Sequence, residues 1–199
     1  MEKPFSPSCE RNKDPILAAI RPVLLNRTCV LEVGSGTGQH AVYFAEKMPW
    51  LNWQCSELQE NLSGLEMWVR EAALSNLPTP INLDVSTSSL MPEFDVVYTA
   101  NTLHIMSIEQ VNDFFKLIGE RAGSVKDVLI YGPFNYAGKY TSASNAQFDS
   151  WLKQRDSASG IRNFEEIHAM ATSNGFKLEK DESMPANNRL LHWQNEEIT

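Results

Sequence analysis

Three glycines alternate with other residues in the stretch VLEVGSGTGQH, residues 30–40, and Glu32 stands two positions before the first of them. Glycine lacks the Cβ atom that would keep a ligand away from the backbone, and it accepts unusual backbone angles. A helix that begins after these glycines would present free N–H groups and the positive end of its dipole, which favours an anion. The stretch therefore predicts a ligand-binding turn at residues 34–38.

Two common phosphate-binding turns do not fit this stretch. The dinucleotide-binding pattern is G-x-G-x-x-G, and its third glycine would fall at residue 39, which is Gln39. A pyrophosphate site also has no evident use for Glu32. The P-loop pattern fails because no Gly-Lys-Ser/Thr follows the glycines. A purely structural role of the glycines in a tight turn stays open.

Two further acidic residues stand at the ends of the next apolar runs. Glu57 ends the run LNWQCSE, and a carboxylate at such a place can accept both hydroxyl groups of a ribose. Asp84 stands in LDV, residues 83–85, at the end of the third run. Each acid alone is typical of a solvated loop. Three acids at successive strand ends, in order, predict one shared binding site.

The runs around these residues alternate between strand and helix patterns, which predicts an α/β fold: a Rossmann-like three-layer sandwich around a mostly parallel sheet. Ser107 with Gln110, and Asn163 with Glu166, have capping-box spacing, and Gly123 and Gly175 are expected to end the two helices. The last two strands have no helix between them and should pair antiparallel. Strands are predicted at 28–33, 51–57, 81–85, 94–101, 127–134, 176–183 and 187–194, and helices at 38–49, 61–76, 108–122, 146–156 and 164–174.

The chain is predicted to be a single domain. Residues 1–27 should form an irregular arm and then a short helix, which Asp14 and Pro15 begin and Pro22 disturbs. Residues 28–199 should form the Rossmann-like core.

Composition narrows the class of protein. The 199 residues carry a formal net charge of −8 and no Lys/Arg cluster, which disfavours a nucleic-acid partner. No apolar run approaches the length of a membrane span and the N-terminus has no signal segment, so a cytoplasmic protein without membrane contact is expected. The odd cysteine count predicts free thiols rather than a disulfide scaffold, and no Cys/His spacing predicts a metal site. The cysteines are Cys9, Cys29 and Cys55, and the histidines outside the candidate site are His40, His168 and His192.

The pattern E-x-G-x-G-x-G at residues 32–38 resembles the first motif of the class I S-adenosylmethionine-dependent methyltransferases. Over nearly the whole chain, the sequence also resembles one family of small, stand-alone methyltransferase-like proteins, long carried as a domain of unknown function. The stretches that carry this second resemblance are FSPSCERNKDPIL, YGPFNYAGKYTSASNAQFD, and GIRNFEEIHAMA followed by MPANN. The resemblance implies a seven-stranded sheet in the order 3-2-1-4-5-7-6, and S-adenosylmethionine as cofactor with S-adenosylhomocysteine as product. It names no substrate.

The resemblance also implies roles for individual residues. The glycine turn would pack against the methionine and ribose parts of the cofactor. Glu32 would interact, directly or through water, with the amino acid end of the cofactor, and Glu57 would bind the ribose. Asp84 and the amide of Val85 would contact the adenine. Asn101 would lie under the cofactor, with His104 towards the substrate. The turn consists of Gly34, Ser35, Gly36, Thr37 and Gly38.

Methyl transfer needs an oriented nucleophile, and a base only if that nucleophile carries a proton that must leave. His104 is the candidate base because an ordinary imidazole pKa suits pH 7, although a structural histidine is an equal alternative. Aromatic side chains in YGPFNY are candidates for a pocket wall, and for packing. The candidates there are Tyr131, which is also a candidate catalytic residue, Phe134 and Tyr136, with Asn135 to orient a substrate.

Two polar stretches are weaker candidates for substrate contact. Arg11 and Asn12, with Lys13, belong to ERNKDP, a candidate lid that is equally well a solvated arm. Asn187 and Asn188 precede the last strand, and a role as turn residues is the alternative for both, because asparagine tolerates the left-handed conformation.

The sequence thus predicts S-adenosylmethionine-dependent methyl transfer to an unidentified, small-molecule acceptor. A module that binds the cofactor without turnover is the first alternative. A nucleotide-dependent oxidoreductase is the second, and Gln39 argues against it. Monomer and homodimer both stay open.

Overall fold

The computed structural model describes residues 3–88, 93–121 and 124–195. Its strands form a seven-stranded, mostly parallel sheet in the order β3-β2-β1-β4-β5-β9-β8. The strand β9 (Asn188–Asn195) runs antiparallel to both of its neighbours, β5 (Asp127–Gly132) and β8 (Phe176–Met184). The strands β8 and β9 are the sixth and seventh strands of this sheet, because β6 and β7 belong to a separate two-stranded sheet. The predicted fold class and strand order are therefore confirmed. The chain divides into two compact units, residues 1–99 and 100–199.

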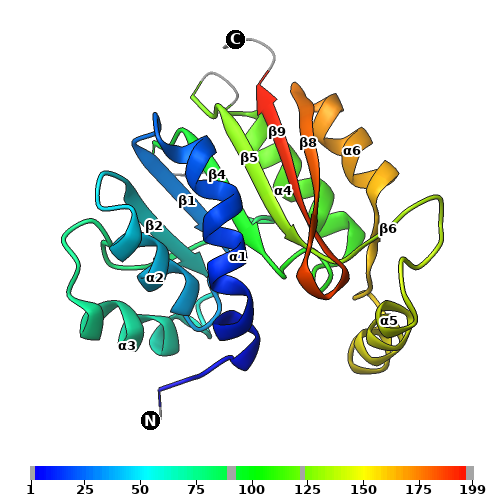
Figure 1. The fold of residues 1–199 in the computed structure, drawn as a ribbon, viewed down its shortest axis with the longest axis horizontal. Coiled ribbons are helices and arrows are strands. Elements are labelled where there is room, and N and C mark those ends of the chain that lie inside the picture. Colours follow the sequence, from blue (N-terminus) through cyan, green and yellow to red (C-terminus); the bar gives the residue numbers. More distant parts are fainter. Residues whose placement is uncertain (1–2, 89–92, 122–123, 196–199) are drawn as a thin grey trace. The chain divides into compact units, whose positions relative to one another are not determined.

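The first unit contains the parallel strands that precede the candidate binding residues. Strand β1 (Cys29–Val33) pairs with β2 (Asn52–Glu57) and with β4 (Val96–Ala100), and β2 pairs with β3 (Ile81–Asn82). Helix α2 (Gln39–Lys47) packs on β2 and contacts both α1 (Pro7–Leu24) and α3 (Leu62–Ala72), as Figure 1 shows. Parallel pairing brings the carboxyl ends of β1, β2 and β3 to one edge.

The N-terminal region differs from its prediction. Ser6 caps a helix that starts at Pro7 and continues to Leu24, with Pro15 and Pro22 inside it. The predicted irregular arm, the helix start at Asp14 and the disturbance at Pro22 are therefore wrong. The buried side chains of this helix recur every four residues, at Ile16, Ile20 and Leu24. Burial of that stripe offsets the backbone hydrogen bonds that the two prolines remove.

Strand β3 is shorter than predicted because the chain turns at Asp84. The amides of Thr87 and Ser88 donate to the Asp84 carbonyl at 3.2 and 2.9 Å, and Ser86 N donates to Asp84 Oδ1 at 2.9 Å. Asp84 therefore lies at the start of a turn rather than in a strand, two residues after the end of β3.

The core of the first unit contains a cluster of three buried aromatic rings. Trp53 lies 5.4 Å from Phe44 and 5.6 Å from Tyr98 between ring centroids, and all three side chains are excluded from solvent. These rings come from β2, α2 and β4. Trp53 donates to Glu32, and Tyr98 is paired with Glu32 across β1 and β4, so this cluster contributes to the environment of Glu32.

The second unit has helices α4 (Ile108–Gly119) and α6 (Phe164–Ser173), which contact each other, and α6 packs on β8. The capping box of Ser107 and Gln110 is present, whereas Gly123 lies outside the described residues. The capping box predicted at Asn163 is wrong, because its side chain accepts no cap hydrogen bond. Its backbone instead pairs in a strand that the sequence did not predict.

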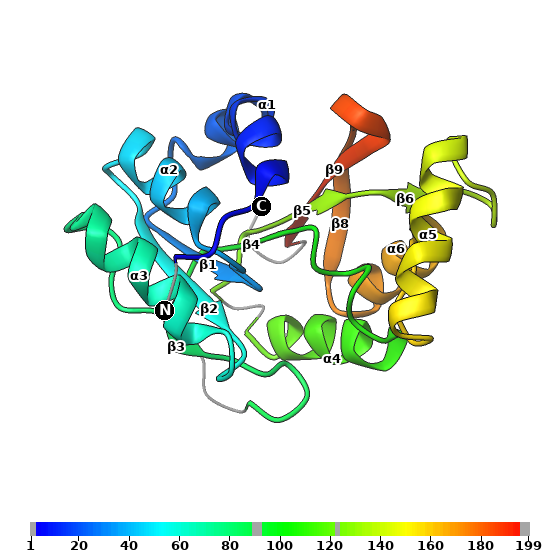
Figure 2. The ribbon, with the colours of Figure 1, turned by 90° about the horizontal axis from the view of Figure 1, so that it is seen from below.

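That strand, β7 (Arg162–Asn163), pairs in parallel with β6 (Phe134–Asn135) to form a small second sheet. The run predicted as one strand at 127–134 divides at Pro133, which has no N–H for the ladder. Figure 2 shows the chain leading from β5 through β6 towards α5 (Ala143–Arg155), which Ser142 caps. A short 3₁₀ turn, η1 (Pro185–Asn187), joins β8 to β9.

The cysteines are free thiols, of which Cys55 is buried and Cys9 and Cys29 are half-buried. None of the helices in the described parts of the chain combines the length and the apolar character of a membrane span.

Candidate functional site

The glycine turn after β1 is tight and has positive φ angles. Gly34, Gly36 and Gly38 have φ values of 72°, 56° and 90°, a region that side chains with a Cβ rarely adopt. The amides of Gly34 and Ser35 both donate to Ser56 O on β2, at 3.1 and 3.0 Å. The turn is thus fixed to the end of the neighbouring strand.

The three glycines do not serve the same purpose. A Cβ added at Gly38 would lie 2.6 Å from Leu65 Cδ1, so this glycine allows α2 to pack closely against α3. A Cβ added at Gly36 would meet nothing within 4 Å. The space beside the Cα of Gly36 is therefore open, as a ligand that approaches the main chain would require.

Glu57, at the end of β2, is joined directly to this turn. Its Oε2 accepts from Gly36 N at 2.8 Å, and its Oε1 accepts from Leu58 N at 2.9 Å. Its carbonyl accepts from Leu83 N at 3.0 Å, next to Asp84. The structure thus brings together the glycine turn and the ends of β2 and β3, as predicted.

Asp84 and Val85 carry hydrogen-bonding groups that the described residues do not use. Asp84 Oδ1 accepts from Ser86 N, whereas Asp84 Oδ2 has no hydrogen-bond partner among the described residues. The amide of Val85 likewise donates to none of them, and its side chain is buried. An acceptor and a donor in adjacent residues match an amino group next to a ring nitrogen, the pattern that adenine presents.

Glu32 is buried in the first unit, with 2% of its surface exposed. Its Oε2 accepts from Trp53 Nε1 at 2.9 Å. Burial raises the pKa of the Glu32 carboxyl to about 7, and the charge of Glu57 adds to this effect, while the Trp53 and Ser35 hydrogen bonds oppose it. Near neutral pH this carboxyl is therefore about half protonated and can gain a full charge when a cation arrives.

Arg11 and Asn12 lie on α1 rather than on an irregular lid. Asn12 Oδ1 is 2.7 Å from His40 Nε2, which commits this side chain to α2. Arg11 is exposed and donates to Ser8 Oγ on its own helix at 3.1 Å. Lys13 pairs with Glu10 at 2.5 Å.

In the second unit, His104 is buried, with 7% of its surface exposed and its ring 5.1 Å from that of Phe148 on α5. Burial, and then the positive charge of Arg162, lower the pKa of His104 to about 4. The expectation of an ordinary imidazole pKa is therefore wrong. His104 is neutral at pH 7 and is a weaker base than an exposed histidine.

The loop that carries His104 is held by a segment that the sequence reasoning missed. The carbonyls of Leu103, His104 and Ile105 accept from Arg162 Nε at 3.1 Å, Gly160 N at 2.9 Å and Ser159 Oγ at 3.1 Å, in that order. The next carbonyl, of Met106, accepts from Arg162 Nη2. Every carbonyl of residues 103–106 is thus bound by segment 159–162.

The same segment is anchored to α5. Asp149 accepts from Ile161 N at 2.7 Å and from Lys153 Nζ at 2.6 Å, and it is almost fully buried. Polar residues in a loop carry no periodic signal, so only the stretch GIRN in the family resemblance pointed to this region.

Tyr131, Asn101 and His104 meet at the carboxyl end of β5. Asn101 N donates to Tyr131 O at 2.8 Å, and Asn101 has a φ of 59°. A Cβ added at Gly132 would lie 3.9 Å from His104 Nδ1. Tyr131 is buried, and its hydroxyl accepts from Asn188 Nδ2 at 3.0 Å.

Asn188 is extended at φ −89°, so the predicted turn role is wrong for this residue, because its side chain is committed to Tyr131. Asn187 has the left-handed φ of 59° that was expected.

Of the remaining residues of YGPFNY, the aromatic ones are hydrogen-bonded or buried, and Asn135 has an unused polar atom. Tyr136 donates to Asp181 Oδ2 at 2.7 Å, and burial, followed by that carboxylate, raises its pKa. Phe134 is buried. Asn135 Nδ2 donates to Ile161 O at 3.3 Å, whereas its buried Oδ1 has no partner among the described residues. Asn135 thus keeps one hydrogen-bond acceptor unused beside segment 159–162.

A sequence profile of a protein family of unknown function (DUF938) matches residues 3–195. The chain belongs to the DUF938 family. This match covers both units and every candidate residue described above.

Solved structures show the fold of the DUF938 protein to be that of the class I S-adenosylmethionine-dependent methyltransferases. An O-methyltransferase family protein from Burkholderia thailandensis has a TM-score of 0.78 and 17% identity, covering 94% of this chain and 57% of that chain. Human N-acetylserotonin methyltransferase in complex with S-adenosylmethionine has a TM-score of 0.75 and 15% identity, covering 94% and 52%. An O-methyltransferase family 2 protein from Planctomyces limnophilus in complex with apigenin has a TM-score of 0.71 and 12% identity, covering 92% and 62%. The DUF938 chain thus spans between 52% and 62% of the length of these proteins.

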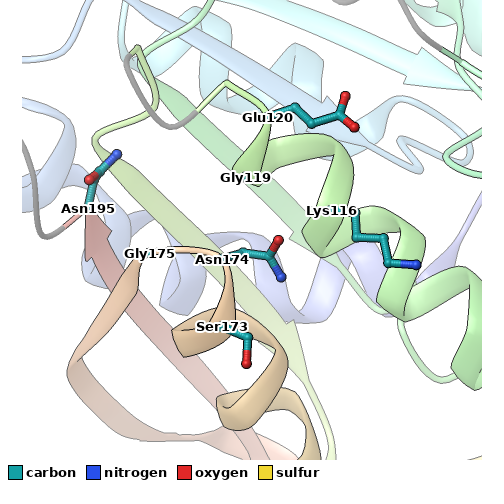
Figure 3. Close-up of a pocket in the computed structure, with 7 residues that line it drawn as sticks. All are labelled: Lys116, Gly119, Glu120, Ser173, Asn174, Gly175 and Asn195. Atoms are coloured by element: carbon teal, nitrogen blue, oxygen red, sulfur yellow. The ribbon is translucent and has the colours of Figure 1, made fainter.

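One pocket of the second unit lies away from the candidate residues of that unit. Figure 3 shows its lining residues near the C-terminal ends of α4 and α6. Its volume is about 510 Å³. Asn195 borders it, next to Gln194, which pairs with Asp127 at the start of β5. Tyr131 and Gly132 stand at the opposite end of that strand. The pocket is lined by Lys116, Gly119, Glu120, Ser173, Asn174, Gly175 and Asn195.

Within the described ranges, the DUF938 protein has no group of three His, Cys, Asp or Glu side chains arranged to hold a metal ion.

Proposed function

We propose that this DUF938 protein is an S-adenosylmethionine-dependent methyltransferase that acts on a small molecule. The observation that carries the cofactor assignment is the pair at the end of β3. Asp84 Oδ2 and the Val85 amide are an unused acceptor and an unused donor in adjacent residues, next to a glycine turn with an open backbone at Gly36. A ligand that displaces water from these two groups must replace the lost hydrogen bonds, because an unpaired buried donor or acceptor costs free energy.

The residues of the first unit fit the parts of that cofactor. Asp84 Oδ2 would accept from the adenine amino group, and Val85 N would donate to the adjacent ring nitrogen. Glu57 already accepts from Gly36 N, and its remaining lone pairs suit the ribose hydroxyls. Glu32 would ionise fully beside the ammonium group of the amino acid end. The turn residues Gly34–Gly38 would contact the methionine and ribose parts.

The cofactor supplies an electrophilic methyl group on a sulfonium, and the second unit would hold the acceptor. Because the pKa of His104 is about 4, we assign it a neutral imidazole that orients the acceptor by a hydrogen bond. Asn135 Oδ1 would accept a second hydrogen bond from the acceptor, since it has no partner among the described residues. Tyr131 would fix the wall of this region through its bond to Asn188, and Asn101 would border the cofactor.

A small-molecule acceptor is supported by the neighbours in fold and by charge. The protein from Planctomyces limnophilus was solved with apigenin, a small molecule. The net charge of −8 disfavours polyanionic acceptors such as nucleic acids.

The second candidate function is a module that binds the cofactor without turnover. The lowered pKa of His104 favours it, because the acceptor's proton would find a weak base at that position.

An acceptor screen separates the two functions. Purified protein is incubated with S-adenosylmethionine and pools of phenols, carboxylic acids, thiols and amines, and formation of S-adenosylhomocysteine is measured. A methyltransferase gives turnover with one pool that Asp84→Ala abolishes and that Asp113→Asn, a control at an exposed ion pair on α4, retains. Cofactor binding without turnover in any pool would instead support the binding module.

A further inference from the structure

The first unit holds its N-terminal residues against the glycine turn, and Gln39 stands at the centre of this contact. Gln39 is 3% exposed. Its Oε1 accepts from Ser6 N at 2.5 Å and from Thr37 Oγ1 at 3.1 Å. Its Nε2 donates to Glu10 Oε1 at 2.8 Å and to Ser6 O at 3.4 Å. One side chain thus joins Ser6 and Glu10 to Thr37 of the turn.

Two neighbouring residues add to this contact. Asn12 Oδ1 lies 2.7 Å from Nε2 of His40, the residue after Gln39. The Cys9 thiol is half-buried, and its pKa is raised by burial first and also by the charge of Glu32, against hydrogen bonds with Ser6 and Thr37. The first turns of α1 therefore lie against the glycine turn and within electrostatic range of Glu32.

The residues before α1 are seated on α3. Trp68 Nε1 donates to Pro4 O at 2.6 Å, and Lys3 Nζ lies 3.7 Å above the centre of the Trp68 ring. A Cβ at Gly64 would come within 2.9 Å of Pro4 Cγ, so this glycine makes room for the segment. Residues 3–12, called the N-terminal segment below, are thus bound to α3 at one end and to α2 at the other.

We propose that Gln39 is a positioning residue for cofactor binding: it fastens the N-terminal segment to the glycine turn, so that the segment and the turn are ordered together by the cofactor. The inference rests on the proposed function. Gln39 does not touch the cofactor in this account and acts through Thr37. The proposal also gives a reason for the residue that departs from the dinucleotide-binding pattern, because glycine would remove all four hydrogen bonds.

The chemistry of the contact requires an amide at position 39. Its oxygen accepts from two donors, Ser6 N and Thr37 Oγ1, and its nitrogen donates to two acceptors, Ser6 O and Glu10 Oε1. A carboxylate there would lose both donated bonds and would face the Glu10 carboxylate. Alanine would lose all four bonds without adding a charge.

Calorimetric titration with S-adenosylhomocysteine tests the proposal. We expect Gln39→Ala to raise the dissociation constant about tenfold, the equivalent of roughly one net hydrogen bond, and Gln39→Glu to raise it further. Glu10→Ala changes only an exposed side chain and should weaken binding to a smaller extent, which protects the test against misfolding of the Gln39 variants. Gln54→Ala is the matched control, because among the described residues Gln54 Nε2 donates only to the carbonyls of Cys55 and Thr79. This variant should bind S-adenosylhomocysteine with wild-type affinity.

Hydrogen exchange distinguishes a positioning role of Gln39 from a merely structural one, because it measures how ligand binding changes amide exchange in each segment. In the wild type, S-adenosylhomocysteine should slow amide exchange in residues 7–12 as well as in residues 34–40. In Gln39→Ala the effect should persist at 34–40 and vanish at 7–12, because coupling between two sites is reciprocal and needs the contact that joins them.

The outcomes separate this inference from the proposed function. Wild-type protein that binds S-adenosylhomocysteine, with unchanged affinity in Gln39→Ala and Glu10→Ala, would overturn the inference alone. So would unaltered exchange at residues 7–12 on binding. Wild-type protein that does not bind the compound would overturn the proposed function and this inference with it.

Discussion

Replacing Glu32 by glutamine should make the protein more stable at alkaline pH and leave it little changed at acidic pH. The carboxyl is buried, and its Oε2 accepts from Trp53 Nε1 at 2.9 Å. Glutamine has nearly the same shape and its carbonyl oxygen can accept the same bond. The substitution therefore removes the ionisation and keeps the packing.

The magnitude follows from the pKa. Burial raises the pKa of Glu32 from 4.5 to about 7, so between these values the folded protein holds a proton that the unfolded chain has released. Stability falls with rising pH wherever the folded state binds more protons, at about 1.4 kcal/mol for each pH unit. The wild type therefore loses about 3 kcal/mol through this group between pH 4.5 and pH 7, and Glu32→Gln does not.

Urea unfolding at pH 5, 6, 7 and 8 measures the difference in the free energy of unfolding between variant and wild type. It should rise towards about 3 kcal/mol as the pH passes 7. Glu71→Gln, at an exposed ion pair with Lys3, is the control and should show no such rise. A difference for Glu32→Gln that stays constant from pH 5 to pH 8, or that falls with pH, would refute the reasoning.

Three further predictions follow from the sites described. Gly38→Ala should destabilise the fold by about 2 kcal/mol or more, because its Cβ would lie 2.6 Å from Leu65 Cδ1, and equal unfolding free energies for this variant and wild type would contradict that packing. Gly36→Ala should cost about 1–2 kcal/mol of stability through backbone strain at φ 56°. It should also abolish S-adenosylhomocysteine binding in calorimetry, because its Cβ would occupy open space that we assign to the ligand; wild-type affinity would remove Gly36 from the site. The imidazole of His104 should stay neutral down to pH 5 in NMR titration, because its pKa is about 4, and the pKa should rise in Arg162→Ala, which removes a nearby positive charge; titration near pH 6.5 in the wild type would show that the ring is not buried as described.

The parallel sheet and the glycine turn were predictable because their signals are local. Alternating apolar runs indicated the strands, and the spacing of Gly34, Gly36 and Gly38 after Glu32 indicated the turn, whose positive φ angles only glycine accepts readily. The positions of Glu57 and Asp84 followed from the geometry of parallel strands, whose carboxyl ends share one edge.

The full N-terminal helix does not follow from its local signals, because proline disfavours a helix interior and only burial of its apolar stripe outweighs this effect. Pro15 and Pro22 each remove one backbone hydrogen bond, whereas Ile16, Ile20 and Leu24 form a stripe that the fold buries. The spacing of these three residues was visible in the sequence.

The properties of His104 were not predictable from its neighbours in sequence. Its pKa depends on burial and on Arg162, which a distant segment of the chain brings close. That segment binds four consecutive carbonyls through a guanidinium, a glycine amide and a serine hydroxyl, a pattern without periodicity. The role of Gln39 was likewise not predictable, because its four side-chain hydrogen bonds depend on the folded position of Ser6 and Glu10.

The central claim is that the first unit binds S-adenosylmethionine and its product. The most direct measurement is calorimetric titration of S-adenosylhomocysteine into cofactor-free wild-type protein, with Asp84→Ala beside it. We expect one-site binding in the micromolar range or tighter for the wild type, and a loss of at least tenfold in affinity for Asp84→Ala, which removes the acceptor for the adenine amino group. Folded wild-type protein that takes up no S-adenosylhomocysteine, or equal affinity in Asp84→Ala, would contradict the central claim.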